Sequence, residues 1–117
     1  MQDLEISIHK AHQLLRESKN LFTTVFRHGT LEVEIYQPEK LDHQQPHDRD
    51  EIYVITSGTG TFLNGGRSWE FKPGDFLFVP AGVEHRFENF TPDFSTWVFF
   101  YGPVGGEAEA SRAGNDR

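Results

Sequence analysis

The sequence contains no cysteine and a single methionine among its 117 residues. Without cysteine, the chain forms no disulfide and offers no thiolate to a metal. It also lacks any apolar run close to the roughly 20 residues that a membrane-spanning helix needs. Its first residues, MQDLE, show neither the basic nor the apolar part of a secretion signal. We therefore expect a soluble, cytoplasmic protein without a membrane partner.

A cluster of basic residues is missing as well. Eleven lysines and arginines stand against eighteen aspartates and glutamates, and the formal net charge is −7. Nucleic acids and anionic membranes are bound through concentrated positive charge, which this chain does not provide. The acidic excess reflects solubility more than the choice of ligand. We therefore expect no nucleic-acid partner, and a small molecule remains as the expected ligand or substrate.

Aromatic residues, by contrast, are plentiful: eleven phenylalanines, three tyrosines and two tryptophans. They suffice for the core of one domain, since a chain of this length buries roughly 65% of its unfolded surface. We divide the chain into a helical segment (1–19), a β-barrel (20–102) and a tail (103–117). The tail is rich in glycine, alanine and glutamate, which predicts disorder. In the first segment, Ser7 is placed to cap a helix over residues 8–17.

From about residue 20 the hydrophobic pattern has the period of two that is typical of strands. Turn signals such as Asn64-Gly65 separate the segments. The second segment has an apolar face and a polar face with Glu32, Glu34 and Tyr36, and we expect the polar face to be wet. Eight such segments predict an all-β jelly-roll barrel with a short N-terminal helix. The expected strands are 22–27, 31–36, 51–56, 60–64, 67–71, 76–79, 84–89 and 95–101.

Two histidines and one glutamate form the candidate functional site. His47 and Glu51 lie near the start of the third expected strand, and His85 lies in the seventh. Because side chains on a strand alternate between faces, all three share one side if the turn after His47 preserves the phase. Inside a small barrel a cation would offset the cost of burying the carboxylate. The alternative is a metal-free barrel in which the three side chains hydrogen-bond to each other.

Such a ligand set leaves open positions on a divalent metal and suits iron(II), manganese, nickel or zinc. The spacing of these residues resembles that of the cupin superfamily, in particular its small, single-domain bacterial members. The second cupin motif, G-x5-P-x-G-x2-H-x3-N, matches Gly74, Pro80, Gly82, His85 and Asn89. The first, ending in H-x3-E-x6-G, matches His47, Glu51 and Gly58.

The resemblance implies a barrel of six to eight strands with the metal inside. It also implies a homodimer, for which the strands over 21–35 are candidates. The first motif departs from the family pattern, H-x-H, because Gln45 stands at the earlier histidine position. Gln45 is a candidate fourth ligand through its amide oxygen, and His43, two residues before it, is the alternative. The charged residues Asp48, Arg49 and Asp50 predict a solvated turn between these ligands and the next strand.

The resemblance and the open metal site together imply an enzyme that acts on a small oxygen-bearing metabolite. With iron, we expect chemistry of the non-haem dioxygenase type; with manganese, nickel or zinc, Lewis-acid isomerisation, epimerisation or decarboxylation. Tyr53 is the one candidate for a catalytic acid–base residue. The alternative is a non-catalytic cupin that binds or senses a small molecule.

Overall fold

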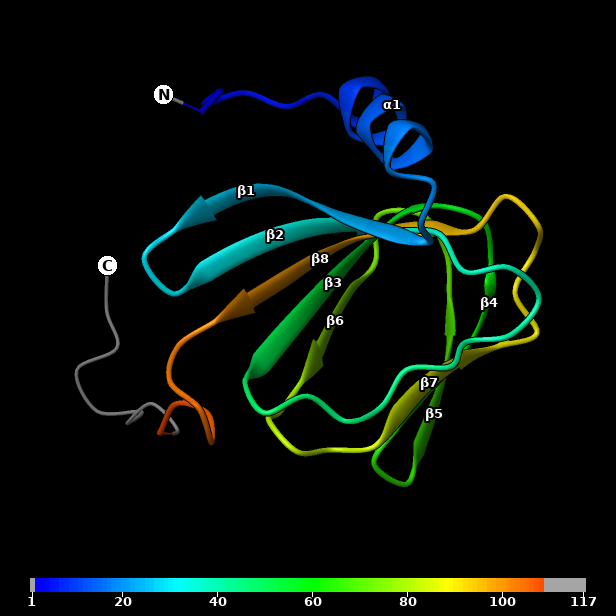
Figure 1. The fold of residues 1–117 in the computed structure, drawn as a ribbon. Coiled ribbons are helices and arrows are strands. Elements are labelled where there is room, and N and C mark those ends of the chain that lie inside the picture. The colour runs from blue at the N-terminus through cyan, green and yellow to red at the C-terminus, as the bar shows by residue number, and fades with distance from the viewer. Residues whose placement is uncertain (1, 109–117) are drawn as a thin grey trace.

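A computed structural model describes residues 2–108, which form one helix followed by eight strands (Figure 1). Residues 109–117, most of the tail for which we predict disorder, lie outside the described residues. Within the described part of the chain, no helix is long and apolar enough to cross a membrane. The elements are α1 (Ile8–Ser18), β1 (Phe22–His28), β2 (Leu31–Tyr36), β3 (Asp50–Ser57), β4 (Gly60–Asn64), β5 (Arg67–Phe71), β6 (Phe76–Val79), β7 (His85–Glu88) and β8 (Ser95–Tyr101).

The strands form two antiparallel sheets. One has five strands in the order β1-β2-β8-β3-β6, and the other has three in the order β5-β4-β7. The two sheets face each other across a common interior (Figure 1). The side chain of Asn64, at the end of β4, links the small sheet to the edge strand β6 by donating to the carbonyl of Phe78 (2.8 Å). These elements confirm the prediction of an all-β, jelly-roll cupin fold with a short N-terminal helix.

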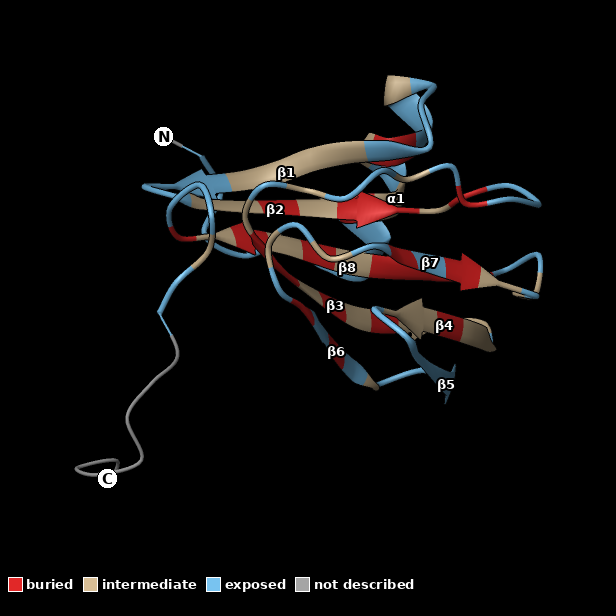
Figure 2. Cartoon of the chain, turned by 90° about the horizontal axis from the view of Figure 1, so that it is seen from below, coloured by how far each residue is buried: buried red, intermediate tan, exposed pale blue. Residues whose placement is uncertain are grey.

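The strand register decides which side chains face the interior. Glu51 of β3 lies opposite Phe100 of β8, and Tyr53 lies opposite Val98. All four are buried, whereas the residues between them in β3 and β8 are only half-buried (Figure 2). Aromatic rings fill most of the space between the sheets, with centroids of neighbouring rings 4.7–5.6 Å apart. The core consists of Tyr36, Tyr53, Ile55, Phe62, Phe71, Leu77, Val79, Phe87, Phe94, Val98 and Phe100.

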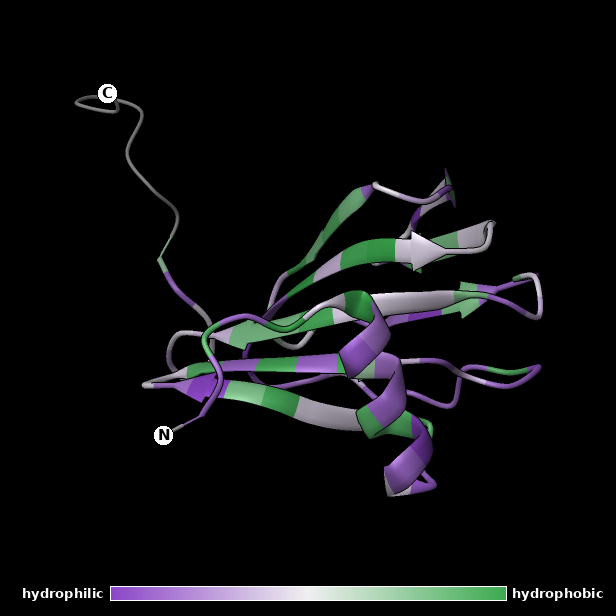
Figure 3. Ribbon diagram, turned by 90° about the horizontal axis from the view of Figure 1, so that it is seen from above, coloured by the Kyte–Doolittle hydropathy of each residue, from purple (hydrophilic) through white to green (hydrophobic). Residues whose placement is uncertain are grey.

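Helix α1 covers the outer face of the large sheet over β1 and β2 (Figure 1). Its N-terminus is capped as expected, since the hydroxyl of Ser7 accepts a hydrogen bond from the backbone N–H of Lys10 (3.0 Å). Ala11 and Leu15 pack against Ile35 of β2 in a second, smaller core. Figure 3 shows apolar and polar residues alternating along the strands beneath α1. The apolar face of β2 therefore points outward under the helix, and its polar face points to the interior.

The loops that carry the two motifs are joined by backbone hydrogen bonds. The N–H of Gly82 donates to the carbonyl of His47 (2.7 Å). The carboxylate of Asp50 accepts from the N–H of Ala81 (3.0 Å) and from that of Glu107 (2.7 Å). Asp50 is thus buried, which corrects the prediction of a solvated turn: its carboxylate satisfies backbone donors from two other loops.

Candidate metal centre

His47, Glu51 and His85 meet in the interior. Each offers one nitrogen or oxygen atom, and the three atoms lie within 4.8 Å of one another. The Oε1 atom of Glu51 lies 3.0 Å from Nδ1 of His47 and 3.2 Å from Nε2 of His85. Among residues 2–108, this is the one group of three histidine or acidic side chains close enough to share a metal ion.

Three different elements deliver the three side chains. Glu51 comes from β3 in the large sheet, His85 from the first position of β7 in the small sheet, and His47 from the loop before β3. Gly82 makes the turn before β7 with φ +79°, a backbone conformation that residues other than glycine rarely adopt. Its N–H also fixes the backbone at His47. The second motif therefore supplies both the ligand His85 and the turn before it, and the Gly82 N–H joins this turn to the loop that carries His47.

Two buried atoms at this centre lack a hydrogen-bond partner. Among the described residues, Oε2 of Glu51 has no partner, and Nε2 of His85 has only the 3.2 Å ion-pair contact with Oε1 of Glu51, which is not a directed hydrogen bond. The Nδ1 atom of His85 lies 2.9 Å from the carbonyl of Val83, which can only accept, so Nδ1 carries the proton. In the neutral ring Nε2 then presents a lone pair toward a fully buried carboxylate. Nδ1 of His47 pairs with Oε1 of Glu51, but the buried Oε2 atom has no partner among the described residues. A buried carboxylate oxygen without a partner is costly, and a divalent cation among these atoms would relieve that cost.

The electrostatics favour an ionised carboxylate. Burial raises the pKa of Glu51, but the imidazoles of His47 and His85 outweigh burial and lower it overall. Burial lowers the pKa of His85, yet Glu51 and the carbonyl of Val83 outweigh burial and raise it. The donor set is therefore an anionic oxygen between two imidazoles, which fits a divalent metal of borderline character.

Tyr53, the candidate acid–base residue, is fully buried beside this centre. Its hydroxyl donates to Oε1 of Gln44 (3.0 Å). Burial and the nearby charge of Glu51 raise the pKa of Tyr53 well above its usual value, so the phenol keeps its proton. Tyr53 therefore acts as a hydrogen-bond donor at this site.

The two candidates for a fourth ligand lie at the surface. Gln45 and His43 are both exposed and line a cleft beside Arg86 and Glu88. The expectation that they share a face with His47 rests on strand alternation, but residues 42–49 form no strand. It is Gln44 that points inward, a residue that the sequence reasoning missed because no motif marks it.

Asp42 was also missed, although it organises the loop. Its buried carboxylate accepts hydrogen bonds from the hydroxyl of Tyr36 on β2 (2.7 Å) and from the N–H of Phe87 on β7 (2.9 Å). It also accepts from the backbone N–H of Gln44 (3.1 Å) and from Nε2 of Gln44 (2.9 Å). Asp42 thereby ties the loop to both sheets and positions Gln44 against Tyr53. A single aspartate between a turn and a histidine carries no signal of such a role.

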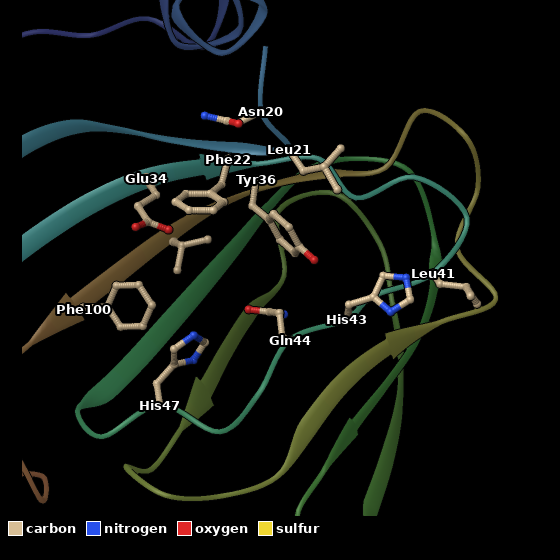
Figure 4. Close-up of a pocket in the computed structure, with 11 residues that line it drawn as sticks. Asn20, Leu21, Phe22, Glu34, Tyr36, Leu41, His43, Gln44, His47 and Phe100 are labelled. Atoms are coloured by element: carbon tan, nitrogen blue, oxygen red, sulfur yellow. The ribbon is translucent and has the colours of Figure 1, made fainter. Parts of the chain in front are cut away.

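A cavity of about 470 Å³ opens next to His47 (Figure 4). Glu34 of β2 lies in the wall of this cavity. It belongs to the polar face of β2, for which the sequence predicts contact with solvent, and this face points to the interior between the sheets. Burial, followed by the charges of Glu32 and Glu51, raises the pKa of Glu34 to about 7. The lining residues are Asn20, Leu21, Phe22, Glu34, Tyr36, Leu41, His43, Gln44, His47, Val98 and Phe100.

Comparison with known proteins agrees with this fold. Residues 32–101 match the family model described as "Cupin domain", so the chain belongs to the cupin family. A cupin 2 conserved barrel domain protein from Rhodopseudomonas palustris superposes with a TM-score of 0.61 at 17% identity. That likeness covers 71% of this chain and 61% of the other, and it shows the fold alone.

Over part of its length, the chain is also similar to curated proteins. An uncharacterized protein of Streptomyces coelicolor is 36% identical over 62 residues, which cover 53% of this chain and 59% of that protein. Acireductone dioxygenase of Rhodopseudomonas palustris strain TIE-1 is 38% identical over 66 residues, with 45% of this chain and 40% of the dioxygenase covered. The chain thus spans about half the length of the curated relatives it matches.

Proposed function

We propose that this protein is a metal-dependent cupin enzyme in which His47, Glu51 and His85 bind a divalent ion. The observation that carries the proposal is the pair of buried atoms without a hydrogen-bond partner, Oε2 of Glu51 and Nε2 of His85. Buried polar atoms are normally paired, and a metal ion is the partner that suits a carboxylate and two imidazoles together. Iron, manganese, nickel and zinc all fit this donor set.

The substrate class is a small oxygen-bearing metabolite bound in the cavity beside His47. A metal held by three protein ligands supplies Lewis-acid chemistry or, if it is iron, dioxygen chemistry. The partial likeness to acireductone dioxygenase supports the dioxygenase type as the first candidate. Isomerisation, epimerisation or decarboxylation with manganese, nickel or zinc is the second.

The chain's own residues organise the site. Asp42 holds Gln44, and Gln44 accepts the hydrogen bond of Tyr53, which keeps the phenol fixed beside Glu51. We propose that Tyr53 keeps its proton and, as a hydrogen-bond donor, positions groups at the metal centre. A fourth ligand from Gln45 or His43 remains part of the proposal, and it requires these exposed side chains to turn inward.

Metal content tests the proposal first. Protein purified without a metal-affinity step is dialysed against each of the four metals and measured by elemental analysis. We expect one ion per chain in the wild type and in His28→Ala. This variant is the control, because it removes an exposed histidine that does not belong to the centre. We expect less than a tenth of that metal in His47→Ala and His85→Ala. Wild-type protein that takes up none of the four metals would refute the metal centre.

Turnover separates the enzyme from a binding protein. Iron-loaded protein is supplied with small diketones, catechols and thiols while dissolved oxygen is recorded. Oxygen uptake that requires His47 and His85 supports a dioxygenase. Chemical change of the substrate without oxygen uptake supports the isomerase type. If the protein holds one metal ion per chain and binds a ligand tightly but does not convert it, the enzyme hypothesis is wrong and the protein is a non-catalytic cupin.

We also propose a homodimer. The outer face of β3, β6 and β8 is apolar beyond the reach of α1, and on β6 Phe76 is 63% exposed and Phe78 is 39% exposed. An apolar patch of this kind is typical of a surface that a partner covers. Light scattering measures the mass: we expect two chains, and one chain in Phe76→Glu. A monomeric wild type would remove the dimer from the proposal, and a cytoplasmic location stays a prediction.

A further inference from the structure

Glu34 is a half-buried carboxylate without a partner. It lies on β2 opposite Val98 of β8, on the face that lines the cavity. Among residues 2–108, no side chain lies within hydrogen-bonding or ion-pairing distance of its carboxylate. Glu32, two positions earlier on the same face, is instead bound by Arg49 (2.8 Å) and approached by Arg27 (3.9 Å). The same strand thus carries one satisfied glutamate and one that still needs a partner.

Aromatic side chains share the cavity lining with this carboxylate. Phe22 and Phe100 line the cavity near Glu34, and Tyr36 lies beyond Phe22 (Figure 4). The hydroxyl of Tyr36 is already engaged by Asp42, so its ring is the part that remains for a ligand. Faces of aromatic rings attract cations, most strongly where water is excluded.

The cavity lining contains no lysine or arginine. Arg49 lies over the ring of Phe100, 5.8 Å from its centre, but Glu32 and the carbonyl of Thr30 hold its guanidinium. A carboxylate with aromatic neighbours, in a cavity lining without lysine or arginine, favours a cation over an anion as its ligand. Burial and the charges of Glu32 and Glu51 raise the pKa of Glu34 to about 7, and the opposing influence of His47 and Arg27 does not offset them.

This carboxylate is also close to the metal centre. The ring of Phe100 contacts the ring of His47, with 4.9 Å between their centroids, and both line the cavity with Glu34. From these contacts we infer that Glu34, Phe22, Tyr36 and Phe100 form a subsite for a protonated amine. The substrate is then a small amine whose oxygen-bearing end points to the metal centre. This inference rests on the proposed function and assigns its substrate class.

The test uses three catechols of similar size whose tails differ in charge. They are dopamine, with an ammonium tail, ethylcatechol, with a neutral tail, and dihydrocaffeate, with a carboxylate tail. Calorimetry on nickel-loaded protein near pH 8 measures binding without redox chemistry. We expect dopamine to bind about tenfold more tightly than ethylcatechol, and dihydrocaffeate to bind most weakly.

Glu34→Gln should remove the preference for dopamine over ethylcatechol. Glu32→Gln is the matched control, since it changes a paired glutamate on the same strand, and it should keep the preference. Equal affinity for the three catechols, or a preference that survives Glu34→Gln, would overturn the subsite. Nickel binding is measured separately: if nickel does not bind, the metal centre fails, whereas bound nickel without the preference contradicts the subsite alone.

Discussion

The two histidines of the metal centre reach the same carboxylate from very different surroundings. The side chain of His85 is fully buried, and its ring is fixed by the carbonyl of Val83. The side chain of His47 is 34% exposed, comes from a loop and lines the cavity. The small sheet therefore supplies a buried, fixed anchor, and the loop of residues 42–49 supplies the side that is open to the cavity.

Removal of each histidine tests this difference most strongly. His85→Ala should destabilise the metal-free protein by about 3 kcal/mol, because it leaves Glu51 buried with one partner fewer. His47→Ala should cost about 1 kcal/mol, since water reaches its position. Both should weaken metal binding by about 100-fold or more. Urea unfolding and metal titration measure the two effects, and equal losses of stability would contradict the assignment of anchor and open side.

Asp42 tests what holds the open side in place. Asp42→Ala should destabilise the protein by about 2 kcal/mol, because donors on Tyr36, Gln44 and Phe87 lose their acceptor. Asp48→Ala, which changes an exposed aspartate of the same loop, should change stability by less than about 0.5 kcal/mol. Thermal unfolding compares the two variants. A neutral Asp42→Ala would mean that the loop is held in some other way.

The raised pKa of Glu34 in the cavity predicts that the stability of the protein depends on pH. This pKa is raised from 4.5 to about 7, so the folded protein holds this proton to higher pH than the unfolded chain does. The resulting decrease in the free energy of unfolding is absent below pH 4.5, grows as the pH rises, and is complete above about pH 7. After allowance for screening by solvent, we expect a loss of about 1 kcal/mol.

The measurement is urea unfolding of the metal-free protein from pH 4.5 to 8. The wild type should lose stability relative to Glu34→Gln across this window, and Glu32→Gln should follow the wild type more closely. Parallel curves for the wild type and Glu34→Gln would show that the carboxylate of Glu34 is solvated.

The smallest expected effects concern the exposed candidates for a fourth ligand. Gln45→Ala and His43→Ala should change metal affinity by less than about threefold if both stay at the surface, as the structure has them. A loss of tenfold or more in one of them would identify that residue as a ligand that turns inward when metal binds. Competition with a chromophoric chelator measures these differences.

The contrast between the two sides also marks how far the sequence predicts the molecule. The eight strands, the cap at Ser7 and the meeting of His47, Glu51 and His85 were all predicted, because local signals determine them. A period of two gives the strands, and the turn at Gly82 orients His85. His85 follows such a turn directly, so its position depends on very little else.

The open side was harder to predict because its signals are not local. The inward position of Gln44 depends on the path of an irregular loop, and that path is set by hydrogen bonds from Asp42 to two distant strands. In β2, alternation separates two faces without showing which one is enclosed. Here α1 covers the apolar face at Ile35, so the polar face with Glu34 lines the cavity.

The central claim is that His47, Glu51 and His85 bind one metal ion together. A crystal structure of the metal-loaded protein, with anomalous diffraction at the metal's absorption edge, tests it most directly. We predict a single strong anomalous peak among the three side chains, about 2.0–2.2 Å from one atom of each. Fully loaded protein whose anomalous peak lies elsewhere, or bound metal that contacts only one of the three residues, would contradict it.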